Sequence, residues 1–253
     1  MELSGNTVLI TGGGSGIGRG LAEALHQLGN AVVIAGRRKD ALDETTEANP
    51  GMQSMLLDIE KRGGVLPFAA EAVGRFPTLN VLINNAGIMR AEKLIDPSED
   101  LADAEAIVAT NLLGPIRLTA ALMPHLKKQP SATIMNVSSG LGFVPMVLTP
   151  TYSATKAAIH SYTQSLRYQL KKTKIEVLEL IPPYVATDLM GGKSDPRAMP
   201  LDKYIAEVMS LLKLQPTPPE ICVENVKRLR FAAENGHYDG IFSGLNSAMA
   251  DIQ

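Results

Sequence analysis

The sequence predicts an α/β protein in which a doubly wound, mainly parallel sheet of six to seven strands carries helices on both faces. Short apolar, β-branched segments alternate along the chain with segments of helical periodicity, and this is the pattern of βα units. Alanine, valine, leucine, isoleucine and methionine supply most of the apolar residues, whereas aromatic residues make up only 4%. Such residues suit parallel strands that are buried on both faces. The 253 residues are expected to form a single domain, 1–253.

Each strand and helix follows from its local pattern. Strands are predicted where short runs are apolar and rich in β-branched residues, over 6–10, 31–36, 52–58, 80–84, 132–138 and 175–181. Helices are predicted where apolar residues recur at helical spacing, over 19–28, 39–48, 66–76, 99–128, 152–172, 201–214 and 219–235. The run 99–128 is expected to break into two helices near Asn111 and Gly114-Pro115. A short strand near 238–242 is expected to close the sheet.

The regular alternation ends at Pro182. Residues 182–200 are rich in Gly, Pro and Met and are expected to form a substrate loop. Gly191-Gly192 gives this loop free backbone torsions between the stiff Pro182-Pro183 and Pro196, so we expect it to move as a lid; a static surface loop is the alternative. The remaining residues, 201–253, are expected to form an atypical helical C-terminal part.

A glycine-rich turn joins the first predicted strand to the first predicted helix. It reads Thr11-Gly12-Gly13-Gly14-Ser15-Gly16-Ile17-Gly18. Glycines let the backbone approach a phosphate closely, and the helix N-terminus then offers free N–H groups and the positive end of its dipole. The context therefore favours pyrophosphate binding by Gly12, Gly16, Ile17 and Gly18 in a Rossmann-type fold, although a plain turn is the alternative. Ser15, inside the turn, can add a hydroxyl donor for a phosphate on the nucleotide's ribose 2′-oxygen.

The ends of the next strands carry groups that suit the rest of a dinucleotide. Gly36, where an acidic residue would bind a free ribose 2′-hydroxyl, is followed by Arg37 and Arg38. Guanidinium groups suit a 2′-phosphate, so NADPH is favoured over NADH unless both arginines are only solvated. After the third strand, Asp58 can accept a hydrogen bond from the adenine amino group while Ile59 packs on the ring. After the fourth, Asn85, Ala86 and Gly87 offer hydrogen-bonding groups and close backbone approach.

A serine, a tyrosine and a lysine follow the fifth strand. Ser139 stands at the strand end, Tyr152 comes thirteen residues later, and Lys156 lies four residues beyond Tyr152 on the same helix face. A neighbouring ammonium lowers the pKa of a phenol from about 10 toward working pH. Tyr152 can thus give a proton to a carbonyl oxygen or take one from an alcohol. A Tyr-x-x-x-Lys motif on its own is more often a chance match than a functional site. The position of this motif after the strand-end serine is what favours a site.

Taken in order, these residues resemble the short-chain dehydrogenase/reductase family over Gly5 to Asp188. The resemblance implies that Tyr152 is the catalytic acid/base, that Lys156 lowers its pKa and holds the nicotinamide ribose, and that Ser139 hydrogen-bonds the substrate oxygen. It also implies that Asn111 holds a water that links Lys156 to solvent. A helix kink is the alternative explanation for Asn111.

Two features depart from the usual family pattern. Pro182-Pro183 replaces the usual Pro-Gly after the sixth strand, which removes a backbone donor. Val185 can still face the nicotinamide carboxamide and Thr187 the phosphates, so cofactor binding is expected to survive. The C-terminus lacks the usual glycine-rich ending. The Pro-Pro pair and residues 238–242 are similar to a bacterial subgroup named after the oxidoreductase of teichoic-acid D-alanylation operons.

The expected substrate is a mainly apolar aldehyde or ketone, or the corresponding alcohol. The expected pocket walls are apolar side chains from 140–150 and 184–199: Leu141, Phe143, Val144, Met146, Val147, Tyr184, Met190 and Met199. Lys193 and Arg197 can meet an acidic group of the substrate or remain solvated. The sequence names no substrate.

The composition of the chain gives no support to nucleic-acid, membrane or metal binding. A formal charge of −2 gives no indication of nucleic-acid or anionic-membrane binding, and the single cysteine and four scattered histidines predict no metal site. A cytoplasmic location is expected because the N-terminal residues run straight into the first strand. Small residues along 152–172 suit close helix packing, and the resemblance implies a homodimer or homotetramer through helices 111–128 and 152–172. A non-catalytic NADP(H) sensor on the same fold, or an epimerase or dehydratase, are the alternatives.

Overall fold

The computed structural model describes residues 1–95 and 100–247, without the side chains of Met190 and Lys193. Within these residues the strands form one parallel sheet in the order β3-β2-β1-β4-β5-β6-β7. The strands are β1 (Thr7–Thr11), β2 (Ala31–Gly36), β3 (Gln53–Leu56), β4 (Leu79–Asn84), β5 (Ala132–Val137), β6 (Ile175–Leu180) and β7 (Glu220–Ile221). The predicted fold class, a doubly wound parallel sheet, is confirmed.

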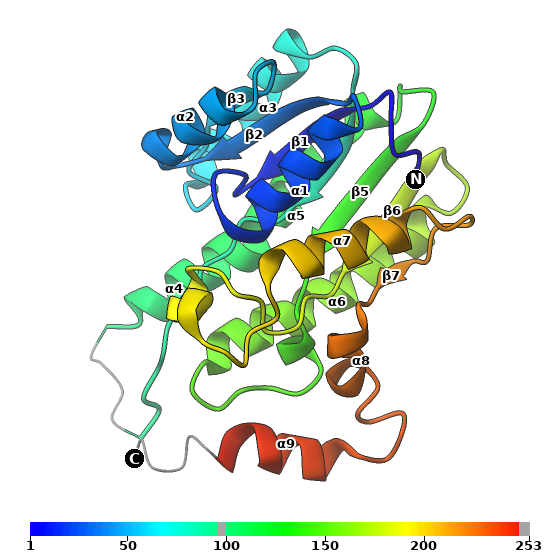
Figure 1. Ribbon diagram of the computed structural model, residues 1–253. Helices are drawn as coiled ribbons and strands as arrows, with labels where there is room; N and C mark the ends of the chain where they lie inside the picture. Colours follow the sequence, from blue (N-terminus) through cyan, green and yellow to red (C-terminus); the bar gives the residue numbers. More distant parts are fainter. Residues whose placement is uncertain (96–99, 248–253) are drawn as a thin grey trace.

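Helices cover both faces of the sheet (Figure 1). They are α1 (Gly16–Gln27), α2 (Lys39–Ala48), α3 (Arg62–Arg75), α4 (Ala102–Val108), α5 (Gly114–Leu126), α6 (Pro150–Leu170), α7 (Leu201–Leu212), α8 (Glu224–Arg230) and α9 (Tyr238–Ser247). One apolar core joins the sheet to α1 and α7, and a second joins it to α3, α5 and α6. The central strands β1, β4, β5 and β6 are thus buried between two helical layers, as their apolar sequences predict, whereas the edge strand β3 is partly exposed.

The order of the strands fixes where a ligand can bind. The chain builds β1, β2 and β3 toward one edge of the sheet and then returns to place β4 on the other side of β1. The connections that follow β1 and β4 therefore lead away from each other and leave a crevice at the carboxyl ends of these strands. The glycine-rich turn follows β1, and Asn85 follows β4, so both stand at this crevice.

The C-terminal part differs from the sequence prediction. Residues 238–242 do not form a strand, because they are the first turns of α9, in which the Tyr238 and Phe242 rings stack with centroids 6.0 Å apart. Aromatic residues four apart are neighbours on a helix. The edge of the sheet is occupied instead by β7, which pairs with β6. The predicted helix 219–235 is accordingly wrong at both ends, and only Glu224–Arg230 is helical.

One helical run, Ala102–Leu126, is long and apolar enough by composition to cross a membrane. Its side chains Leu118, Leu122 and Leu126 are fully buried in the core beneath the sheet. The apolar sequence of this run is therefore that of a core helix. Glu99, where the sequence analysis starts this helical region, lies outside the described residues.

Candidate active site

A cleft of about 1450 Å³ runs along the carboxyl ends of the strands. Its walls extend from the glycine-rich turn, 11–18, past the ends of β2, β3, β4 and β5 to α8 and α9. We call this feature the cleft. Every predicted cofactor-binding residue lines it: Gly12, Ser15, Gly16, Ile17, Gly18, Arg37, Arg38, Asp58, Ile59, Asn85, Ala86, Gly87, Tyr152, Lys156, Val185 and Thr187.

The glycine-rich turn is packed too tightly for side chains. Gly12 has a positive φ of 68°, and a Cβ there would lie 2.9 Å from the Asn85 side-chain nitrogen. A Cβ on Gly18 would overlap the Gly12 carbonyl oxygen and the Asn85 side-chain amide. Thr11 fixes this arrangement, since its Oγ1 accepts hydrogen bonds from the backbone N–H groups of Asn85 and Ala86 at 3.1 Å each. The turn therefore leaves backbone N–H groups at the start of α1 exposed to the cleft, which suits a pyrophosphate.

Two arginines stand beside this turn at the β2 end of the cleft. Arg38 Nη2 donates a hydrogen bond to Ser15 Oγ at 2.8 Å. Arg37 Nη1 lies 4.0 Å from a Glu60 carboxylate oxygen, a loose contact between exposed side chains. Asp58 is 3.4 Å from Lys61 Nζ. Both guanidinium groups thus remain at the cleft wall, where a 2′-phosphate would meet them.

Tyr152, Ser139 and Lys156 come together in the middle of the cleft. The Tyr152 hydroxyl is hydrogen-bonded to the Ser139 side chain, and Ser139 Oγ also accepts from the N–H of Leu141 at 3.1 Å. Lys156 Nζ lies 5.4 Å from the Tyr152 ring centroid and donates to the Val137 carbonyl at 2.9 Å. The tyrosine and the lysine are only 6% and 4% exposed. The helix spacing and the strand end thus place a proton donor, a hydroxyl and a cation side by side.

In the protein without ligand, burial is the largest influence on the pKa values of Tyr152 and Lys156. It raises the pKa of Tyr152 to about 12, against the opposing effect of the Ser139 hydrogen bond. It lowers the pKa of Lys156 to about 8. In this state desolvation of the phenolate is the largest influence on the Tyr152 pKa, and the lowering effect of Lys156 stays a prediction. Tyr152 is protonated at neutral pH, which is the form that a general acid needs.

Asn111 lies in a π-helical turn, Ala109–Leu113, that links α4 to α5 in one continuous helix. Pro115 has no N–H for the Asn111 carbonyl four residues earlier, so the hydrogen-bond pattern changes here to a π-turn. The expected break into two helices is wrong, because the helix continues from α4 through this turn into α5. The Asn111 side chain is bonded to both backbone groups of Ile88 at 2.8 Å. Its Oδ1 and Lys156 Nζ both flank Gly87. The residue thus holds the segment after β4 next to Lys156, and its role in a water relay stays a prediction.

Some predicted pocket residues line the cleft and others do not. Leu141, Met146 and Tyr184 line it. Phe143 instead packs edge-on against His160, with ring centroids 4.6 Å apart, and lies under the Arg230 guanidinium. Val144 is fully buried. These two predictions are wrong because the turn Gly140–Gly142 directs the following side chains into the core.

The other residues between positions 147 and 199 that were predicted to contact the substrate also differ from the prediction, where the structure describes their side chains. Val147 and Met199 are absent from the cleft wall as far as the structure describes it, since Met199 packs on the core and bridges to Val185. Arg197 lines the cleft but is bound to Asp195, with Nη2 2.6 Å from Oδ2. The pair leaves no free cation at that position. The side chains of Met190 and Lys193 lie outside the described residues.

The C-terminal helices supply cleft residues that the sequence analysis missed. Asn225, Arg228 and Leu229 of α8 line the cleft, as do Gly244 and Leu245 of α9. Asn246 fixes α9 to the loop before α6, because its Oδ1 accepts from the Val147 N–H at 2.9 Å. The spacing of Asn225 and Leu229 is helical, but no motif in this region indicates a ligand.

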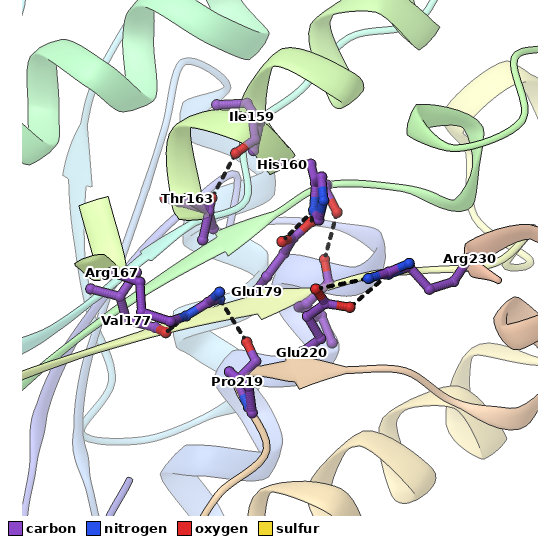
Figure 2. Close-up of polar contacts among 12 residues, drawn as sticks. Ile159, His160, Thr163, Arg167, Val177, Glu179, Pro219, Glu220 and Arg230 are labelled. Carbon is purple, nitrogen blue, oxygen red and sulfur yellow. Dashed lines mark hydrogen bonds and ion pairs between the residues drawn. The ribbon is translucent and has the colours of Figure 1, made fainter. Parts of the chain in front are cut away.

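A buried polar cluster lies one turn beyond Lys156 on α6 (Figure 2). His160 Nδ1 is 2.8 Å from Glu179, a fully buried carboxylate on β6. Glu220 of β7 lies near both and receives two hydrogen bonds from Arg230, at 2.6 and 3.1 Å. The three possible ligand atoms are within 4.8 Å of one another, but the arginine already neutralises Glu220. The cluster ties α6, β6, β7 and α8 together.

Comparison with known proteins indicates one protein family. A family model for short chain dehydrogenases matches residues 6–198. The oxidoreductase DltE of Bacillus subtilis strain 168 is 38% identical over 252 residues, which cover 98% of this chain and 99% of that protein.

Solved structures share the fold. A short chain dehydrogenase of Burkholderia cenocepacia in complex with NADP is 24% identical, with a TM-score of 0.81 over 97% of this chain and 99% of that one. A 3-ketoacyl-(acyl-carrier-protein) reductase of Brucella melitensis complexed with NADH is 29% identical, with a TM-score of 0.76 over 85% of this chain and 94% of that one.

Proposed function

The chain belongs to the short-chain dehydrogenase family of oxidoreductases, and on that premise we propose that it reduces the carbonyl group of a mainly apolar small molecule with NADPH, or oxidises the corresponding alcohol. The observation that supports this proposal is the contact of Tyr152 with Ser139 beside Lys156, inside a cleft that continues to the glycine-rich turn. A regulator that only binds nucleotide needs none of these three side chains.

The site's own residues account for the proton side of the reaction. Ser139 hydrogen-bonds the substrate oxygen and orients the carbonyl. Tyr152, protonated at neutral pH, gives its proton to that oxygen. The Lys156 ammonium stabilises the phenolate that remains. Bound NADPH would supply the hydride.

The residues present fit this cofactor. The glycine-rich turn lines the cleft with backbone, and a Cβ at Gly12 or Gly18 would displace this packing. Arg37 and Arg38 offer cations for a 2′-phosphate, and Asp58 and Ile59 stand where an adenine would lie. The test of the function is NADPH oxidation against a panel of aldehydes and ketones. If no member of the panel accelerates NADPH oxidation while the protein binds NADPH, the proposed activity is wrong.

The choice between the two nucleotides depends on the arginines. We expect wild type to bind NADPH more tightly than NADH, and Arg37→Ala to lose roughly tenfold to a hundredfold in NADPH affinity, because a charge-assisted contact is lost. Calorimetry with both nucleotides measures this. Arg75→Ala, an exposed arginine on α3 that pairs with Glu71, is the matched control and should change neither affinity. Equal affinities of wild type for NADPH and NADH would contradict the proposal.

The substrate loop is expected to close over bound ligands. Its two ends are joined by the Val185–Met199 bridge and by hydrogen bonds of Met199 N–H to Tyr184 O and of Ala186 N–H to Met199 O, each 2.9 Å. The segment that can move is therefore the part between these ends. We expect hydrogen exchange in 186–198 to slow when NADPH and a substrate analogue bind. Unchanged exchange at saturating ligand would show that the loop is static.

We also propose a cytoplasmic homodimer or homotetramer that packs through helices 111–128 and 152–172. The small side chains Ala154, Ala157, Ser161 and Ser165 lie at helical spacing on α6 and are exposed, so another helix can approach closely. The molecular mass from light scattering tests the assembly, and a monomer at micromolar concentration would exclude it.

A further inference from the structure

Helix α8 directs one uncommitted cation into the cleft. Lys227 Nζ donates to Glu224 at 2.6 Å. Arg230 donates to Glu220 and, through Nη1, to Glu234 at 2.6 Å. Arg228 lies between them in sequence and lines the cleft, and among the described residues it makes no ion pair or hydrogen bond. Its guanidinium donors are therefore available to a ligand.

Arg228 stands near the reacting end of the cleft. Helix α8 packs on the turn that follows Ser139, because a Cβ on Gly140 would lie 2.8 Å from Leu229 Cδ1 and 3.0 Å from Val226 Cγ2. Asn225, one turn before Arg228, also lines the cleft. Residues three apart share a helix face, so an amide and a guanidinium form one polar wall beside the catalytic group.

The position of this wall excludes the cofactor as its ligand. The glycine-rich turn follows β1 and Arg37 follows β2, whereas α8 follows β7 at the opposite edge of the sheet. The phosphates of a dinucleotide belong to the first two positions. An anion that meets Arg228 is therefore part of the substrate.

The charge balance at this end favours a single negative charge. Arg197 and Asp195 neutralise each other, and Asp188, also on the cleft wall, has a partner of its own. The neighbouring walls are apolar, from Leu141, Met146 and Leu245. Among the side chains that the structure describes at this end, one free guanidinium and one amide suit the planar, singly charged carboxylate, whereas a phosphate dianion calls for a second cation.

The buried cluster of Figure 2 fixes the helix that carries Arg228. Arg230 is held by Glu220 on β7, and its guanidinium lies 4.7 Å from the Phe143 ring centroid. Since β7 pairs with β6, whose Glu179 binds His160 of α6, α8 is tied to the helix that carries Tyr152 and Lys156. The backbone position of Arg228 relative to Tyr152 is therefore fixed, and only its side chain has to order on a ligand.

We propose that Arg228, assisted by Asn225, binds a carboxylate of the substrate, so that the preferred substrate is an apolar carbonyl compound with an acidic group at its far end. This inference rests on the proposed reductase function. Arg228 is a specificity-determining residue in it, and the carbonyl lies between this wall and Tyr152.

Two probes that differ in one negative charge and one methyl group test the charge. The wild type should reduce 4-formylbenzoate with a higher kcat/KM than methyl 4-formylbenzoate, and Arg228→Gln should lower the ratio of acid to ester about tenfold. Lys227→Gln removes the preceding cation of α8, which is absent from the described cleft wall, and should leave the ratio unchanged. An unchanged ratio in Arg228→Gln, or an equal loss in Lys227→Gln, would overturn the inference.

A binding measurement separates this inference from the reductase function. The product alcohol, 4-(hydroxymethyl)benzoate, cannot react with protein saturated with NADPH, so calorimetry gives its affinity without turnover. We expect binding that weakens about tenfold in Arg228→Gln, with no such loss for Lys227→Gln. If neither aldehyde is reduced but this difference in binding is found, the function fails and the carboxylate site stands. Equal binding to wild type and Arg228→Gln overturns the site even in an active enzyme.

Discussion

Replacing Tyr152 by phenylalanine is expected to lower turnover by a factor of about 10² to 10⁴ while the protein stays folded and binds NADPH nearly as before. The substitution removes only the hydroxyl, and the ring keeps its place beside Lys156. The Ser139 hydroxyl loses one hydrogen-bond partner but keeps the Leu141 N–H. Steady-state kinetics on a substrate that the wild type reduces, together with calorimetry of NADPH, measure the two effects separately.

Tyr162 offers a matched control for this experiment. It lies on the same helix as Tyr152, is partly buried, and its hydroxyl is bonded to Thr119 on α5. Tyr162→Phe should change stability slightly and turnover little, since this hydroxyl is away from the cleft. A Tyr152→Phe protein with nearly wild-type turnover would mean that another group supplies the proton.

Replacing Gly18 by alanine is expected to lower kcat/KM for NADPH more than the same replacement of any other glycine in the turn. The new Cβ would overlap the Gly12 carbonyl oxygen and the Asn85 amide, so the backbone that faces the pyrophosphate must shift. A displacement of about 1 Å at a binding element costs roughly a hundredfold in rate, so kcat/KM for NADPH should fall by about that factor. Overpacking should also lower the melting temperature by roughly 2 to 10 °C.

The same chemical change elsewhere provides the control. Gly63 lies in α3, and a Cβ there would meet nothing within 4 Å. Gly63→Ala should leave NADPH kinetics unchanged and should not lower the melting temperature, because the new Cβ meets no other atom. Wild-type NADPH kinetics in Gly18→Ala would show that the turn tolerates the side chain and that its packing does not shape the phosphate site.

The sheet could be predicted from the sequence because its signals are local. Each strand from β1 to β6 is a short apolar run bounded by turn residues, and each lies in the predicted position, although β3 is shorter than 52–58. The strand at the edge could not be predicted, because β7 has only the residues Glu220 and Ile221 and owes its conformation to pairing with β6. Two residues carry no periodicity that a sequence pattern can reveal.

The residues of the site also fall into two groups: those placed by local sequence patterns and those placed by long-range contacts. Gly12, Ser139, Tyr152 and Lys156 could be placed because a turn, a strand end and one helix face fix their geometry. The walls of the substrate end depend on which way the chain leaves Gly142, so Phe143 was expected in the cleft and packs under Arg230 instead. Arg228 belongs to a helix whose contact with Gly140 is long-range, and no spacing in the sequence encodes that contact.

The bridge between Val185 and Met199 has a consequence for how this scaffold can diversify. Backbone pairing of Val185 with Met199 closes the base of the loop. The residues between these two positions, here called the cassette, can therefore vary in length and composition with little effect on the sheet. Insertions and substitutions there can alter what is admitted to the cleft, while Tyr152 and Lys156 stay on α6. New substrate ranges can thus evolve, or be engineered by exchanging this cassette between relatives, at low risk to the fold.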